Sequence, residues 1–146
     1  MFDRAVKVSL EAGRWVPFVE QIVIEGEDLT GAVFAMQVRD RKDGGMLRAN
    51  LVTVATANIQ GIRLVGVTMG GTSYVDGSAL PPTTPTSTIE ICISEATMAA
   101  MAVASDGGAP GDDATIYWDL HVTLPGKLKT LAFYGPFIIK AGSTQS

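Results

Sequence analysis

The feature that most constrains this sequence is the alternation of apolar and polar residues along short segments. In Ala114–Val122, apolar side chains occupy every second position, and tyrosine, aspartate and histidine lie between them. Thr88–Ser94 follows the same pattern, with isoleucine at every second position. Successive side chains of a β-strand point to opposite faces, so this period indicates strands that bury one face. The sequence therefore predicts sheets with one face on a core and the other toward solvent or a partner.

The same reading predicts further strands along the chain. They lie near Ala5–Leu10, Val16–Ile24, Ala32–Arg39, Leu47–Ala55, Ile62–Val67 and Leu128–Ile139. Glycine, aspartate, asparagine and proline favour turns, which we expect at Glu11–Arg14, Glu25–Thr30, Arg41–Gly45, Asn58–Gly61 and Leu124–Lys127. In the final strand, Gly135 and Pro136 predict a bulge or an edge position, because proline has no amide hydrogen to donate to a ladder.

One segment departs from this pattern. Ser94–Met101 combines good helix formers with a serine that can cap the first turn and with Glu95 at the positive end of the helix dipole. We therefore expect one short helix at a corner of the fold. Closely spaced strands without alternating long helices indicate an all-β protein, an antiparallel sandwich or barrel, rather than an α/β fold.

The length of 146 residues is typical of one domain, so we expect residues 1–146 to fold as a single unit. Residues 69–87 and 105–113 are rich in proline, glycine or hydroxyl side chains, and they predict two long loops that pack no core. Within the first loop, Val75–Ser78 is expected to turn a small hairpin. We expect residues 69–87 and Ala141–Ser146 to be contact segments for neighbouring subunits.

Charge and composition argue against several classes of partner. The net charge is −4, and the nearest approach to a basic stripe, Arg39–Lys42 with Arg48, is interrupted by Asp40 and Asp43. We therefore expect a solvated hairpin turn there and no nucleic-acid partner. No apolar run reaches the roughly 18 residues of a membrane span, and none follows the N-terminus at signal-peptide length, so we expect neither membrane association nor secretion. Cys92 is the only cysteine, which excludes an intramolecular disulfide and a thiolate metal cluster.

The single histidine and the single cysteine make poor catalytic candidates. His121 lies within a predicted strand, and the chain contains no glycine-framed serine elbow with which it could form a triad. Cys92 lies between two isoleucines, which favours a packed or interface side chain over a nucleophile.

The carboxylates are also unconvincing as a site. Asp106, Asp112 and Asp113 supply oxygen atoms in a glycine-rich loop, but they lack the alternating order of an EF-hand. Other carboxylates flank turns, where pairs resembling those of a glycosidase occur by chance; these are Glu25, Glu27, Asp28, Asp40 and Asp43. We therefore predict that the chain is not an enzyme and that it has no catalytic residues, no metal site and no cofactor.

Several short motifs, in order from Phe18 to Lys140, point to a known family. The first motif is DLTG at Asp28–Gly31, which precedes a strand that ends near Q-x-R. The second is a strand that leads into a small helix, at Ile89–Thr97. The third is a closing hairpin with a Pro-Gly turn, formed by Tyr117–Leu120 and Leu131–Lys140. Together they resemble the N-terminal domain of siphophage baseplate upper proteins and related tail modules. This chain differs by its inserted loop at residues 69–87 and by Trp118 inside the closing hairpin.

The resemblance implies an immunoglobulin-like sandwich that docks onto other virion proteins of a tailed bacteriophage, without a cofactor. We expect a tail, baseplate or fibre-anchoring adaptor; a capsid decoration or a neck protein is the alternative within the same class. The location would be the virion, after assembly in the host cytoplasm, and repeated virion components predict a homo-oligomer. A mean hydropathy of +0.26 is consistent with apolar surface covered by neighbours.

The alternative from a different functional class is that the chain is a module that binds carbohydrate or another host-surface ligand. Tyr74 and Trp15, together with the threonine-rich loop, are the candidates for such a stacking surface.

Overall fold

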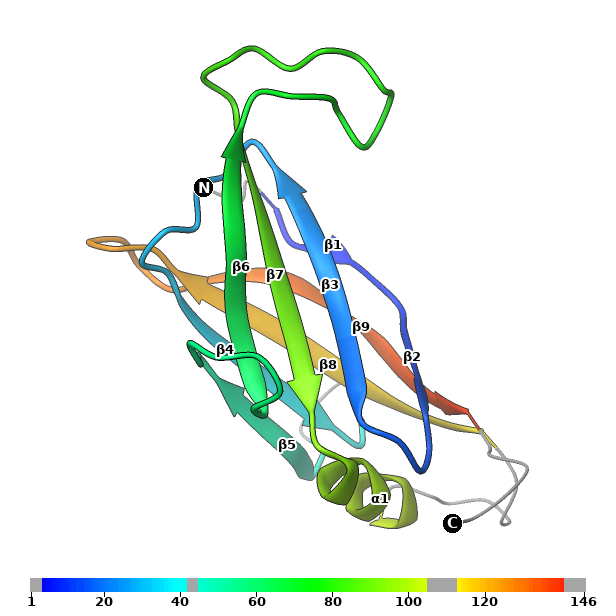
Figure 1. Cartoon of the computed structure of the whole chain (residues 1–146). Helices are drawn as coiled ribbons and strands as arrows, with labels where there is room; N and C mark the ends of the chain where they lie inside the picture. The colour runs from blue at the N-terminus through cyan, green and yellow to red at the C-terminus, as the bar shows by residue number, and fades with distance from the viewer. Residues whose placement is uncertain (1–3, 42–44, 105–112, 141–146) are drawn as a thin grey trace.

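The computed structural model describes residues 4–41, 45–104 and 113–140. Over these ranges the chain forms nine strands and one helix (Figure 1). Their bounds are β1 (Val6–Lys7), β2 (Leu10–Gly13), β3 (Phe18–Glu25), β4 (Val33–Arg39), β5 (Leu47–Val52), β6 (Gly61–Met69), β7 (Pro85–Ile93), α1 (Glu95–Ala104), β8 (Ala114–Thr123) and β9 (Thr130–Lys140). Every predicted strand after the first is present as one strand, with ends that shift by a few residues.

The strands form two sheets. One is six-stranded, in the order β1-β9-β8-β4-β5 with β2 also on β9; the other is three-stranded, in the order β3-β7-β6. The pairs are antiparallel except that β1 and β2 run parallel to β9. The chain thus crosses between the sheets after β2, β3, β5 and β7, and the first strands lie beside the last one, as in immunoglobulin domains. The predicted all-β, immunoglobulin-like sandwich is confirmed.

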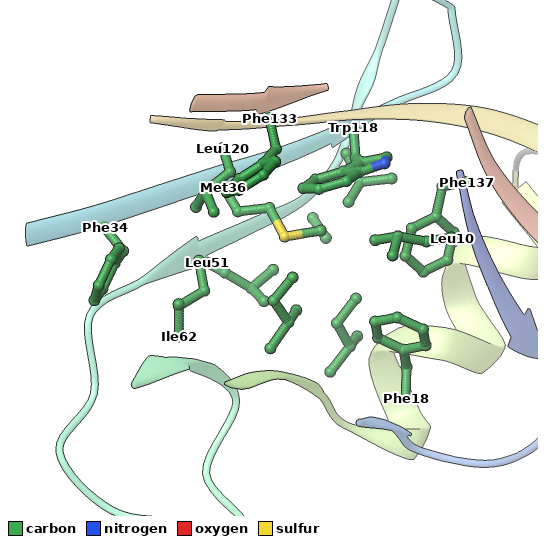
Figure 2. Close-up of a cluster of buried hydrophobic side chains, with 14 of the residues drawn as sticks. Leu10, Phe18, Phe34, Met36, Leu51, Ile62, Trp118, Leu120, Phe133 and Phe137 are labelled. Carbon is green, nitrogen blue, oxygen red and sulfur yellow. The ribbon is translucent and has the colours of Figure 1, made fainter. Parts of the chain in front are cut away.

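The core lies between the two sheets. Ile89, Ile91 and Ile93 of β7 are fully buried, and Ile116, Trp118 and Leu120 of β8 are at most 3% exposed, as the alternation predicts. Side chains from both sheets meet there, and the rings of Phe18 and Phe137 lie 5.1 Å apart (Figure 2). Burying each such large apolar side chain stabilises the fold by about 1.5–3 kcal/mol.

The N-terminal edge differs from the sequence prediction. Instead of one strand at Ala5–Leu10 followed by a turn at Glu11–Arg14, two strands, β1 and β2, pair with β9 and are separated by Val8 and Ser9. The separation lies opposite Gly135, where a Cβ atom would approach the Val8 carbonyl oxygen to 2.2 Å. The interruption thus lies where the backbone next to Val8 leaves no room for a side chain at position 135.

The prediction of a bulge or an edge position at Gly135 and Pro136 is wrong. Both residues pair in register with β8, and β9 lies inside the sheet, between β8 and the N-terminal strands. The register shift of this hairpin falls between Leu120 and His121 instead. The missing proline amide is tolerated because Pro136 lies where the pairing with the N-terminal strands is interrupted.

The turn that follows β3 is held by side chains. Asp28 Oδ1 accepts hydrogen bonds from the Thr30 amide at 3.0 Å and from the Thr30 hydroxyl at 2.6 Å. These bonds lower the pKa of Asp28. Gly31 has a φ of 76°, as a tight connection requires, and Leu29 is fully buried. The DLTG segment is therefore a structural turn that inserts one leucine into the core.

The helix and the turn between β8 and β9 follow the sequence prediction. Ser94 Oγ accepts a hydrogen bond from the Thr97 amide at 3.3 Å, which caps α1, and Met98 is buried against the core. The Lys127 amide donates to the Leu124 carbonyl at 3.0 Å between β8 and β9. Of the β4–β5 turn, residues 42–44 lie outside the described part of the chain.

Candidate docking surface

The longest described connection joins β6 to β7. The predicted loop at residues 69–87 is shorter in the structure, because Met69 still belongs to β6 and Pro85 already begins β7. Thr86 and Ser87 are buried, so the expectation that this segment packs no core is wrong at its C-terminal end. Proline is compatible with the first position of a strand, and the strand is therefore longer than its composition suggested. The second predicted loop, residues 105–113, lies outside the described residues except for Asp113.

Residues 70–84 form a projection with hydrogen bonds of its own. The Gly70 amide donates to Thr84 at 2.8 Å, and the Leu80 amide donates to Gly71 at 2.8 Å. Beyond a bridge between Thr72 and Ala79, the Ser73 amide donates to the Ser78 carbonyl at 2.8 Å. The predicted small hairpin at Val75–Ser78 is thus confirmed. Figure 1 shows the projection, in green, extending beyond the end of the sandwich opposite α1.

The projection is anchored to the sandwich through one carboxylate. Glu25, the last residue of β3, accepts hydrogen bonds at Oε2 from the Tyr74 amide at 3.2 Å and from the Ser73 hydroxyl at 3.4 Å. Ser73 Oγ in turn accepts a hydrogen bond from the Val75 amide at 3.1 Å. Glu25, one of the carboxylates that flank predicted turns, is therefore a structural anchor that fixes the direction of the tip.

The tip exposes apolar side chains although hydrogen bonds hold its backbone. Tyr74 is 75% exposed and Val75 is 88% exposed. Asp76 lies beside them and accepts hydrogen bonds from the hydroxyl and the amide of Ser78, which lower its pKa. The tip (Tyr74, Val75 and Asp76) thus combines one aromatic ring, one aliphatic side chain and one carboxylate at the far end of an anchored projection.

A second apolar area lies on the outer face of the three-stranded sheet. Val19 and Val23 of β3 are 52% and 39% exposed. Next to them, Glu90 accepts hydrogen bonds from Gln21 at 3.1 Å and from Arg63 at 3.1 Å, and these bonds lower its pKa. The face is therefore ordered across all three strands but not covered by any described residue of this chain.

The two aromatic residues proposed for a sugar-binding surface do not lie together. Tyr74 contacts Glu25 at the C-terminal end of β3, whereas Trp15 precedes Phe18 at the other end of that strand. An eight-residue strand separates them, and at about 3.3 Å per residue this distance is too long for one monosaccharide. The predicted pairing of Tyr74 with Trp15 is therefore wrong.

The single histidine and the single cysteine lie on outer sheet faces. His121 Nδ1 is 3.7 Å from Asp119 Oδ1, on the outer face of the six-stranded sheet. Cys92 lies on the outer face of β7, where burial, with a smaller contribution from Glu90, raises the pKa of its thiol. A raised pKa leaves the thiol protonated, so it is a weak nucleophile.

The remaining candidate carboxylates are engaged in structure or lie outside the described residues. Asp40 forms an ion pair with Arg48, with Oδ1 2.5 Å from Nε, and its pKa is lowered. Asp113 Oδ2 is 3.0 Å from Lys140 Nζ. Asp43, Asp106 and Asp112 fall in the segments that the structure does not describe. Within the described ranges, histidine, cysteine and carboxylate side chains form no group of three or more that could hold a metal ion.

The described residues include no helix of the length and apolar character needed to cross a membrane. No protein-family model matches this sequence, and no curated protein matches it significantly. A family 123 glycoside hydrolase from Clostridium perfringens has a similar segment, with a TM-score of 0.36 and 13% identity over 93% of this chain. This chain spans 23% of the length of that hydrolase. At this TM-score and identity, the likeness assigns neither a family nor an activity.

Proposed function

We propose that this protein is a structural adaptor of a tailed-bacteriophage virion, in the tail, in the baseplate or at a fibre anchor, and that it acts through protein–protein contacts. The observation that carries the proposal is the projecting tip, because Tyr74 and Val75 are exposed although their backbone is fixed by hydrogen bonds. An exposed tyrosine on a backbone that is already ordered is an effective anchor at an interface, since little backbone conformational entropy is lost when it binds.

The motifs shared with siphophage baseplate upper proteins support the same proposal. The DLTG segment forms a turn held by Asp28, and the segment after β7 forms a capped helix, so both motifs have structural roles. The uncovered outer face with Val19 and Val23 offers a second contact area. Virion components repeat, and self-association of this chain is therefore part of the proposal.

The proposal assigns no catalytic role to the chain. His121 and Cys92 lie on the outer faces of different sheets, so these two side chains do not form a nucleophile–base pair.

The test is incorporation into virus particles produced by cells that carry the gene. The double variant Tyr74→Ser, Val75→Ser should fold normally by circular dichroism, because both side chains are exposed, but its amount per purified particle should fall severalfold. Leu128→Ser is the matched control, because Leu128 is also 88% exposed but lies in the β8–β9 turn. Absence of the wild-type protein from purified particles would overturn the proposal, as would normal incorporation of the double variant. Immunogold labelling of the particles distinguishes the tail from the capsid and the neck.

A further inference from the structure

A hollow of about 410 Å³ lies on the outer face of the six-stranded sheet, away from the projecting tip. Strands β1, β4, β8 and β9 and the residues after β4 contribute to its lining. The side chains that the argument uses are Lys7, Arg39, Arg41, Tyr117, Asp119 and Tyr134. Its volume is within the range of small-ligand sites in proteins, about 300–1,000 Å³.

Strand register builds the hollow from segments that are distant in sequence. One row across four strands runs Gln37, Asp119, Tyr134 and Lys7, because each residue pairs with the next. The neighbouring row on the same face pairs Arg39 with Tyr117 and Tyr117 with Pro136. Rows two residues apart on one face are separated by about 7 Å, so cations and tyrosines lie within reach of one small ligand.

The electrostatics of the hollow differ from those of the whole protein. Three cationic side chains and one carboxylate line it, whereas the chain as a whole has a net charge of −4. The Arg39 guanidinium is held by bonds from Nη2 to Gln37 Oε1 at 2.5 Å and from Nη1 to the Gly45 carbonyl at 3.3 Å. The hollow therefore favours an anion, and Arg39 is preorganised to bind one.

The hollow also offers a hydrogen-bond acceptor. Asp119 Oδ1 is buried and accepts no hydrogen bond from any described residue, although His121 Nδ1 lies 3.7 Å away. Oδ1 is closed to solvent, but the Asp119 side chain is 35% exposed, so a ligand hydroxyl would donate to the other oxygen of the same carboxylate, Oδ2. The ligand that fits must carry an anionic group, hydrogen-bond donors and an apolar surface that can contact Tyr117 and Tyr134.

We propose that this hollow binds a carboxylate-bearing saccharide unit of the hexuronate type. The carboxylate would pair with Lys7 and the arginines, a sugar hydroxyl would donate to Asp119, and the ring would contact the tyrosines. An acidic peptide carries the same charge but fits this place less well, because extended peptides commonly bind β-sheets by pairing with an exposed edge strand. The floor of this hollow is made by strands that are already paired on both sides, β8 and β9. The inference does not depend on the adaptor function.

The test is a titration of the ¹⁵N-labelled chain, followed by amide chemical shifts and by calorimetry. The probes are tetragalacturonate, uncharged maltotetraose and an acetylated tetraglutamate peptide. Tetragalacturonate should shift the amides of Tyr117, Asp119 and Tyr134, while maltotetraose should not. Lys7→Glu and Arg41→Glu, two changes at exposed side chains, should each weaken its binding about tenfold. Lys127→Glu makes the same charge change in the β8–β9 turn and should leave the affinity unchanged.

Three outcomes would overturn the inference. The first is the absence of tetragalacturonate binding at millimolar concentrations. The second is tighter binding of the tetraglutamate peptide at the same amides, which would assign the hollow to a protein partner. The third is an equal loss of affinity in Lys127→Glu, which would indicate nonspecific attraction by surface charge.

Discussion

The indole nitrogen of Trp118 donates a 3.0 Å hydrogen bond to the carbonyl oxygen of Val8, 110 residues earlier in the chain. The Val8 amide in turn donates to the Tyr134 carbonyl at 2.8 Å. Trp118 thus packs the core and also holds the segment between β1 and β2 against β9. Because Lys7 immediately precedes Val8, the same bond positions one wall of the hollow on the outer face.

Substitution of Trp118 should separate these two roles. Trp118→Phe keeps an aromatic ring in the core but removes the donor, so the free energy of unfolding should fall by about 1–3 kcal/mol. Trp118→Ala also creates a cavity and should cost about 3–5 kcal/mol. Urea denaturation followed by circular dichroism measures both values. An unchanged unfolding midpoint for Trp118→Ala would contradict the assignment of this residue to the core.

Gly135 should tolerate no side chain. Its φ is 153°, and a Cβ atom there would approach the Val8 carbonyl oxygen to 2.2 Å. Gly135→Ala should therefore detach the N-terminal strands, accelerate hydrogen exchange of the Val8 amide and lower the unfolding free energy by more than about 2 kcal/mol. Gly66→Ala is the matched control, because a Cβ atom at Gly66 meets no atom within 4 Å. Equal effects of the two substitutions would show that the close approach is not what destabilises Gly135→Ala.

Substitutions at Ser87 and Thr86 compare a buried hydroxyl that has hydrogen-bond partners with one that has none among the described residues. Ser87 Oγ accepts a hydrogen bond from the Leu29 amide at 3.0 Å and donates one to the Glu27 carbonyl at 2.6 Å. Ser87→Ala leaves both backbone groups without this partner and should cost about 1–3 kcal/mol. The buried hydroxyl of Thr86 has no hydrogen-bond partner in the described part of the chain, so Thr86→Val should be neutral or stabilising. Thermal unfolding compares the two, and a larger loss for Thr86→Val would contradict this account.

Acid should weaken the fold through carboxylates with lowered pKa values. Arg48 lowers the pKa of Asp40, and the hydrogen bonds from Gln21 and then Arg63 lower the pKa of Glu90. A lowered folded-state pKa stabilises the protein above the unfolded-state pKa, and this contribution is lost as the pH falls through the folded-state pKa. The contribution of these two carboxylates to the free energy of unfolding should be constant above about pH 5 and should fall below about pH 4. Urea titrations at several pH values measure the slope, which Asp40→Asn should reduce; an undiminished slope would contradict the role of that ion pair.

Local patterns in the sequence predicted the strands, because side-chain alternation follows from the geometry of each strand. Ile89 and Ile116 are buried for this reason. The cap of α1 was predictable too, because Ser94 accepts a hydrogen bond from an amide only three residues later in the chain. The parallel pairing of β2 with β9 was not predicted, since it depends on the close approach of Val8 to Gly135. The start of β7 was missed for a similar reason, because Ser87 is buried by a turn about sixty residues earlier in the chain.

In the candidate sites, too, local features were predictable from the sequence and long-range contacts were not. The hairpin at Val75–Ser78 was predictable from its turn residues, but its anchoring by Glu25 was not, because that contact joins residues 49 positions apart. The hollow was not predicted at all. Tyr117 and Asp119 share the outer face by alternation, but only the register of four strands brings them to Lys7 and Arg39.

Site-specific photo-crosslinking within assembled particles tests the adaptor proposal most directly. The photoreactive residue p-benzoylphenylalanine replaces Val75 at the tip or, as a control, Leu128, which is equally exposed at 88%. After irradiation of purified particles, mass spectrometry identifies the crosslinked chains. The account predicts crosslinks from position 75 to another virion protein, in clear excess over position 128. Particles that contain the protein but yield no crosslink from position 75, or equal crosslinking from both positions, would contradict it.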